Sequence, residues 1–374
     1  LLAGLLARPD QMEDRDFRVA LALQGIIGNL RADPQNLRLP NPADMVAQVR
    51  ESFYRASHHW RPWMNPLSLK GFADHYNAQT LESWDVPKLL VDPANRWLTE
   101  ITRPGPQIIT GMRGCGKTML LRALDIHARA TQRKDETAEA VIQRIRNDRF
   151  VGLFVSAQRL LDLREQSLLK LEYRLTRLFV AYALQAARAL MHLRDVDSTA
   201  IAPGAHTRLA SAVADYLEGV DDLRDSISLD DLEQRLQRIA VLTVSGDEKH
   251  LVKQAPAEVF NHLASSLREC SEVFESASIF YLLDDVSTRY LELDKIEALL
   301  SALLFQSPIC AFKFTSEWQT IELGLRSPGR NHPIRIDRDL TVFDLGEDVF
   351  KTISAPGSAG KDFIARILQL RADL

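Results

Sequence analysis

Gly111-Met112-Arg113-Gly114-Cys115-Gly116-Lys117-Thr118 is the stretch that decides how the rest of this sequence is interpreted. It fits the pattern GxxxxGK[ST] without a mismatch, and this pattern is typical of a loop that binds nucleotide phosphates. Residues 106–110 form a short apolar run that predicts a buried strand, and residues 119–124 open an amphipathic helical pattern. The succession of strand, loop and helix separates a phosphate-binding loop from a chance match.

The residue types of this loop suit the chemistry of an anion. Glycines let successive backbone N–H groups turn inward, and the following helix directs its positive end toward the phosphates. We expect Lys117 to reach the β- and γ-phosphates and the Thr118 hydroxyl to ligate Mg²⁺. The predicted nucleotide-binding residues are the loop and the residue after it: Gly111, Met112, Arg113, Gly114, Cys115, Gly116, Lys117, Thr118 and Met119.

A second element supplies carboxylates. Residues 278–283 form a continuous apolar run, which is typical of a strand buried on both faces of a parallel sheet, and Asp284 and Asp285 follow it. We expect Asp284 to hold the metal, directly or through water. Asp285 falls where many ATPases with a phosphate-binding loop of this type carry a glutamate that polarises the attacking water. Because aspartate is one methylene shorter, Asp285 is either the base with a slightly different water position or the mark of a slow hydrolase.

A strand is predicted over residues 150–155, and the third strand of the site is predicted over residues 309–314, after the helical pattern of residues 293–304. This alternation of strand and helix favours right-handed crossovers and a parallel sheet. In P-loop ATPases with an extra central strand, a polar residue at the tip of this strand points between the metal carboxylate and the γ-phosphate. Thr315 or Ser316 would be that residue, and Thr315 is our candidate.

An arginine is expected to follow the third strand. In ring-forming ATPases an arginine from the neighbouring subunit neutralises charge on the transferred phosphate. Arg330, on a turn-like segment, is the first candidate for this role. The other candidates are Arg326, Arg335 and Arg338 in the same region, and Arg113 and Arg289, which could act within one subunit.

Length and composition bound the class of protein. The 374 residues can form two or three domains, and contents of 46% hydrophobic and 26% charged residues are typical of a soluble globular protein. A net charge of −4 gives no general attraction to nucleic acid. The three cysteines have no metal or disulfide spacing, and no stretch approaches the roughly 18 apolar residues of a membrane span. We therefore expect a cytoplasmic protein with no membrane partner.

Three parts are predicted along the chain: a helical N-terminal region over residues 1–65, an ATPase core over residues 66–345, and the start of a C-terminal helical lid over residues 346–374. The core would hold a long helical insertion at about residues 156–275. The insertion begins basic and becomes acidic, and opposed charge blocks suit contact between subunits about as well as they suit solvated helix faces. The basic residues are Arg159, Arg164, Lys170, Arg174, Arg177, Arg188 and Arg194. The acidic residues are Asp215, Glu218, Asp221, Asp222, Asp225, Asp230, Asp231 and Glu233.

The motifs together resemble those of a known family. The phosphate loop with residues 119–121, the lead-in Pro93-Ala94-Asn95-Arg96-Trp97, and the later segments 337–339 and 362–368 are similar to bacterial ATPases related to origin-recognition AAA+ proteins. The resemblance covers roughly residues 66–374. The acidic segment 282–286 also resembles that of the STAND switch ATPases.

The resemblance implies an α/β fold of the P-loop NTPase type, with the phosphate loop as Walker A and the acidic strand as Walker B. It implies ATP and Mg²⁺ as ligands, a homo-oligomer as the assembly, and a separate effector protein as the partner, often in bacterial antiviral systems. The alternative is a DNA-acting ATPase of the initiator or clamp-loader kind, in which the basic helix after Arg159 touches the duplex.

Overall fold

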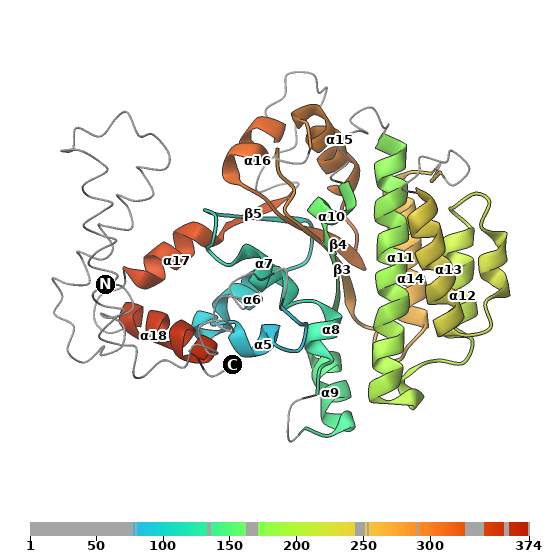
Figure 1. The fold of residues 1–374 in the computed structure, drawn as a ribbon, viewed down its shortest axis with the longest axis horizontal. Coiled ribbons are helices and arrows are strands. Elements are labelled where there is room, and N and C mark those ends of the chain that lie inside the picture. Colours follow the sequence, from blue (N-terminus) through green and yellow to red (C-terminus); the bar gives the residue numbers. More distant parts are fainter. Residues whose placement is uncertain are drawn as a thin grey trace, which may run out of the picture. The chain divides into compact units, whose positions relative to one another are not determined.

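A computed structural model gives the fold of most of this chain (Figure 1). It separates into two units, Leu81–Lys351 and Leu1–Thr80 with Thr352–Leu374. The predicted helical region at residues 1–65 lies outside the described residues, so that part of the domain division stays a prediction. The structure describes residues 78, 81–132, 136–161, 171–243, 251–252, 254–288, 291–325, 340–354 and 359–372.

The first unit is built on one parallel sheet of five strands, in the order β2-β3-β4-β1-β5. This confirms the predicted α/β fold with a parallel sheet and flanking helices. The fifth strand was not predicted: it is as short as β1, but its burial is partial and no phosphate-loop motif follows it. The strands are β1 (Gln107–Thr110), β2 (Phe150–Ser156), β3 (Ser278–Asp284), β4 (Cys310–Thr315) and β5 (Thr341–Asp344).

The strand order brings three chemically important segments to one edge of the sheet. β4 lies between β1 and β3, with Ile109 opposite Thr315 and Leu283 opposite Phe314. Because all strands are parallel, their carboxyl ends meet at the same edge, which is where ligands bind in open α/β sheets. The phosphate loop after β1, the acidic pair at the end of β3 and the tip of β4 therefore become neighbours.

Helices cover the sheet, with α7 against β3 and β4 and α11 against β2. Among the described residues, none of the helices combines the length and the apolar character that crossing a membrane would need. The helices of the first unit are α5 (Val86–Leu89), α6 (Arg96–Ile101), α7 (Lys117–Arg122), α8 (Ile126–Arg129), α9 (Ala138–Asp148), α10 (Ala157–Leu161), α11 (Leu171–Val196), α12 (Ala205–Ala214), α13 (Leu229–Leu242), α14 (Pro256–Glu269), α15 (Leu293–Leu303), α16 (Trp318–Leu325) and α17 (Leu345–Ile353), and α18 (Ala359–Ala372) belongs to the second unit.

The helices between β2 and β3 share their core with the sheet. In Figure 1, α11 to α14 stand together on one side of the sheet, and α11 contacts the other three. Tyr182 of α11 and Phe260 of α14 pack edge to face against Tyr281 of β3 and Phe312 of β4, with ring centroids 4.9–6.0 Å apart. The Tyr281 hydroxyl donates to the Phe260 carbonyl at 2.7 Å. This aromatic cluster holds the long segment between β2 and β3 against the centre of the sheet.

The opposed charge blocks of this segment pair with each other inside the chain. Arg188 Nε of α11 donates to Glu233 of α13 at 2.9 Å, and an Arg194 N–H donates to Asp230 at 2.6 Å. These residues find partners for their charges within the chain, because α11 and α13 pack along each other. They do not need another subunit for this purpose. Two further basic residues of α11 are buried: Arg174 and Arg177. Arg164 and Lys170 lie outside the described residues.

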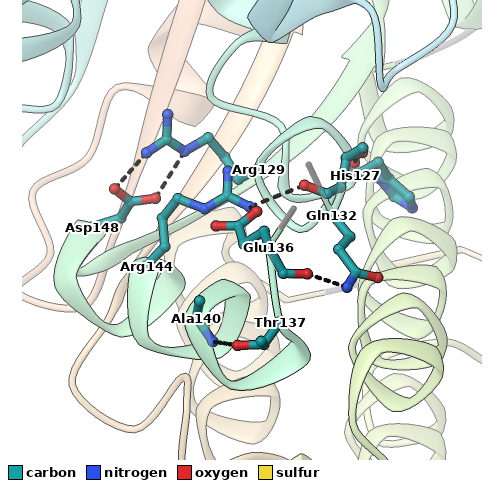
Figure 2. Close-up of polar contacts among 9 residues, drawn as sticks. His127, Arg129, Gln132, Glu136, Thr137, Ala140, Arg144 and Asp148 are labelled. Carbon is teal, nitrogen blue, oxygen red and sulfur yellow. Dashed lines mark hydrogen bonds and ion pairs between the residues drawn. The ribbon is translucent and has the colours of Figure 1, made fainter. Parts of the chain in front are cut away.

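The two short helices that follow the phosphate-loop helix are joined by ion pairs (Figure 2). Arg129 of α8 donates to the Asp148 carboxylate at the end of α9, with Nε 2.8 Å from Oδ2, and Arg144 of α9 donates to Glu136 at 2.9 Å. The Thr137 hydroxyl caps α9 by accepting from the Ala140 N–H. Both helices contact the edge strand β2. The Arg129–Asp148 ion pair therefore links two helices that pack on the same strand.

A lysine lies fully buried in the central strand β4. Lys313 Nζ donates to the carbonyls of Arg103 at 2.5 Å and Gly105 at 2.9 Å and to the Gln107 side chain at 3.3 Å, and it lies 4.8 Å from the Phe280 ring centroid. Burial lowers the pKa of the Lys313 amine to about 7. The amine therefore fastens the loop before β1 to β4, at the edge of the sheet opposite the phosphate loop.

Replacing Lys313 with Met should remove a pH dependence of stability between pH 7 and 9. In this range the unfolded chain, with an ordinary lysine pKa of 10.5, holds a proton that the folded chain has largely released. The free energy of unfolding should therefore rise with pH in the wild type, with a slope of up to about 1.4 kcal/mol per pH unit from this residue. Denaturant unfolding across this range measures it. Lys88→Met, at an exposed lysine, should keep the wild-type slope, and an equal slope in Lys313→Met would contradict the assignment.

Candidate functional site

The loop between β1 and α7 has the backbone of an anion cradle. Gly111, Gly114 and Gly116 have φ angles of +136°, +87° and +101°, a region that side chains disfavour. A Cβ atom added at Gly114 or Gly116 would meet nothing within 4 Å. The loop is thus open at these two positions, where a phosphate can approach the backbone closely.

Lys117, the first residue of α7, lies over its own loop. Its Nζ donates to the carbonyl oxygens of Gly111 at 2.7 Å and Met112 at 3.2 Å. An ammonium group has three N–H donors, so these bonds leave one donor for a phosphate oxygen. The first two loop residues therefore set the position of the charge that the sequence assigns to phosphate binding.

Asp284 joins the three segments that meet at the sheet edge. Its Oδ1 accepts from the Thr118 hydroxyl of α7 at 3.2 Å and from the Thr315 hydroxyl of β4 at 2.5 Å. The side chain is fully buried, and Oδ2 has no hydrogen-bond partner among the residues that the structure describes. Burial raises the pKa of the Asp284 carboxyl above its ordinary value, and the two hydroxyl bonds partly oppose that rise.

The donor set at Asp284 fits a magnesium ion. A carboxylate oxygen without a partner and a nearby threonine hydroxyl are oxygen ligands of the kind that Mg²⁺ prefers. Within the described part of the chain, no group of three or more His, Cys, Asp or Glu residues could hold a metal by itself. Such a sparse site is typical of Mg²⁺ bound together with substrate phosphates, and it differs from an all-protein cage.

Asp285 and the tip of β4 are linked through one hydroxyl. The Asp285 N–H donates to Thr315 Oγ1 at 2.7 Å, and Asp285 has a φ of +61°, which is uncommon for a residue with a side chain. Ser316 turns away, since its hydroxyl donates to the Val286 carbonyl. Of the two residues proposed at the strand tip, only Thr315 contacts the acidic pair.

A pocket of about 360 Å³ opens beside the first half of the loop. Two large apolar side chains at its rim are exposed, Met112 by 65% and Trp318 by 44%. Sequence reasoning missed the residues that α16, β5 and α17 contribute, although the spacing of Asp344 and Glu347 is that of a helix cap, and Asp344 Oδ1 does accept from the Glu347 N–H at 2.9 Å. The lining residues are Gly111, Met112, Arg113, Glu317, Trp318, Gln319, Asp344, Gly346 and Glu347.

The arginine candidates are divided between described and undescribed parts of the chain. Arg113 is exposed on the phosphate loop and lines the pocket. The predicted subunit-bridging residue Arg330 lies outside the described residues, as do four alternatives: Arg289, Arg326, Arg335 and Arg338.

Comparison with known protein families gives a match over most of the chain. The model of a protein family described as ORC-CDC6-like matches residues 71–373, which is well over half of the chain. No curated protein and no solved structure gives a significant match.

Replacing Asp284 with Asn should stabilise the protein without ligand and abolish its response to Mg²⁺ with nucleotide. The folded state raises the pKa of this carboxyl, so at neutral pH it carries a buried charge that the unfolded chain solvates better. Asn keeps an oxygen for Thr118 and Thr315, and we expect the free energy of unfolding at pH 7 to rise.

Thermal unfolding with and without Mg²⁺ and nucleotide measures both effects. Asp294→Asn, at the start of α15, is a matched control that should leave the response to Mg²⁺ and nucleotide unchanged. A destabilised Asp284→Asn protein, or one that still responds fully to Mg²⁺ with nucleotide, would contradict the assignment.

Proposed function

Because the chain belongs to the ORC-CDC6-like family, an AAA+ ATPase family, we propose that it is a Mg²⁺-dependent ATPase whose ATP-bound form self-associates and controls a separate effector. The observation that carries this proposal is the convergence of Thr118 and Thr315 on Asp284. It joins the loop that would bind phosphate to the strand that would bind the metal, within one buried hydrogen-bond network.

Each residue has a defined task in this proposal. The loop N–H groups and the remaining Lys117 donor bind the phosphates of ATP. Thr118 and Asp284 would hold Mg²⁺, which neutralises charge on the β- and γ-phosphates when bound. Asp285 would accept the proton of the attacking water, and Thr315 holds the backbone of Asp285 and the carboxylate of Asp284 in register.

We also propose that the ATP-bound assembly controls an effector. AAA+ proteins of this family typically oligomerise, and the aspartate at position 285, one methylene shorter than glutamate, suits slow turnover in which bound ATP acts as a switch. Arg330 remains our candidate for the arginine that completes the neighbouring subunit's site. The sequence resembles bacterial ATPases that often act with a separate effector in antiviral systems. This resemblance supports an antiviral effector protein as the partner.

The family relation to origin-recognition proteins also supports a second candidate, an ATPase that acts on DNA. In this candidate function, the basic helix α11 would contact the duplex. In the described part of that helix, two arginines are buried and two are paired with α13 carboxylates, so they do not form a free row of charges for a phosphate backbone. An ATP-dependent, salt-sensitive shift of duplex DNA would favour this candidate.

The mass of the protein in solution should depend on nucleotide. We expect a small species without ligand or with ADP, and a larger assembly with an ATP analogue and Mg²⁺, because the γ-phosphate would be read by residues of two subunits. Light scattering on the eluted protein, with turnover measured in parallel, tests this. An unchanged mass in every state would contradict the switch and the arginine in trans.

Two substitutions should separate binding from turnover. Lys117→Ala should abolish measurable nucleotide binding, because it removes the ammonium from the loop. Asp285→Asn should bind nucleotide as the wild type does and lose turnover by about 10²-fold or more, the usual contribution of a general base. Titration with a fluorescent nucleotide and phosphate release measure the two effects. Unimpaired hydrolysis in Asp285→Asn would remove Asp285 from this role.

A further inference from the structure

Gly346 is a glycine that its own backbone conformation does not require. It lies within the first turn of α17 and is absent from the residues with positive φ. Inside a helix, glycine costs about 0.5–1 kcal/mol relative to alanine, because it leaves more backbone entropy to be lost. The need for glycine at this position must therefore come from the space around it.

That space is occupied by the phosphate loop. A Cβ atom at Gly346 would lie 2.9 Å from Gly111 Cα, 2.9 Å from the Met112 nitrogen and 3.2 Å from Asp344 Oδ1. In the other direction, a Cβ atom at Gly111 would lie 2.5 Å from the Gly346 nitrogen. Cβ atoms do not approach backbone atoms this closely without displacing them. The backbones of α17 and the loop are thus in direct contact, with no room for a methyl group between them.

The α17 side of this contact is firmly held. β5, which runs directly into α17, pairs with β1 up to the register of Thr110 with Asp344. Two residues further along α17, the Asp348 carboxylate accepts hydrogen bonds from the side chains of Arg96 and Trp97 on α6. A side chain added at Gly346 would therefore push the loop more easily than it would push the helix.

We propose that Gly346 is a positioning residue for nucleotide binding, a role that rests on the function proposed above. The residues it touches, Gly111 and Met112, are the two whose carbonyls hold Lys117 Nζ. The backbone of α17 therefore sets the position of these carbonyls, and they set the position of the ammonium that meets the phosphates. Gly346 acts on the loop, and through the loop on Lys117.

Gly346→Ala tests the proposal through binding and turnover. We expect the Kd for ADP and ATP to rise by about tenfold or more, since small displacements of a binding group are costly, while kcat at saturating ATP changes little. Gly204→Ala is the matched control. It places the same methyl group on a glycine with a φ of +74°, before α12, where a Cβ meets nothing within 4 Å, so it adds strain without touching the loop.

A second readout needs no nucleotide. The Cys115 sulfur lies 2.9 Å from the Cβ position of Gly111, so it packs where the loop would be displaced, whereas Cys270 and Cys310 are buried elsewhere in the core. Alkylation of the ligand-free protein, followed by peptide mass spectrometry, should show faster labelling of Cys115 in Gly346→Ala and unchanged labelling of the other two cysteines. Faster labelling of all three would mean general unfolding and would overturn the positioning role.

A further variant keeps the proposal open to failure if Gly346→Ala folds poorly. Asp348→Ala removes the anchor of α17 on α6 without adding atoms near the loop, and it should raise the Kd and the Cys115 labelling rate in the same direction by a smaller factor. Wild-type affinity and labelling in both variants would overturn the proposal. If the wild type itself bound no nucleotide, the proposed function would fail, while the labelling rates would still report on the contact between α17 and the loop.

Discussion

One carboxylate oxygen organises the functional end of this protein. Asp284 Oδ1 accepts hydroxyl hydrogens from two threonines that belong to different elements, one on the helix after β1 and one on the tip of β4. The observed order places β4 between β1 and β3, and this brings the three carboxyl ends together. The strand order and the site are therefore two aspects of one constraint.

The neighbouring strands β3 and β4 each carry a buried ionisable group. At the carboxyl end of the sheet, the Asp284 carboxylate is buried with one oxygen unpaired, while at the amino end Lys313 is surrounded by oxygen acceptors. Burial of a charge is costly unless hydrogen bonds compensate it. Three oxygen acceptors around Lys313 offset only part of its burial, since its pKa falls to about 7, and the amine fastens the loop before β1. Asp284 is left incompletely satisfied, as expected of a group that awaits a cation.

The path from the lead-in helix to the phosphate loop runs through α17. Asp348 binds α6, and Gly346 contacts the loop two residues earlier on the same helix. Sequence reasoning could not find this path, because Gly346 reads as an ordinary helical glycine and its reason is a backbone 235 positions earlier in the chain. The pocket-lining residues on α16 and β5 were not predicted either, because they too lie far from the loop in the chain.

The sequence by itself determined the loop at residues 111–118 and the strands β1, β2, β3 and β4. Glycine spacing and short runs of apolar residues are local properties of the chain, so they can be recognised without the fold. It also predicted a parallel α/β fold, which follows from the alternation of strands and helices. It left Thr315 and Ser316 as alternatives, and it left the two charge blocks of the insertion between contact with another subunit and solvated helix faces. Only the tertiary structure turned Thr315 toward the acidic pair, paired α11 with α13, and placed Gly346 against Gly111. These are contacts between segments far apart in the chain, and they depend on which elements pack side by side, which no local pattern encodes.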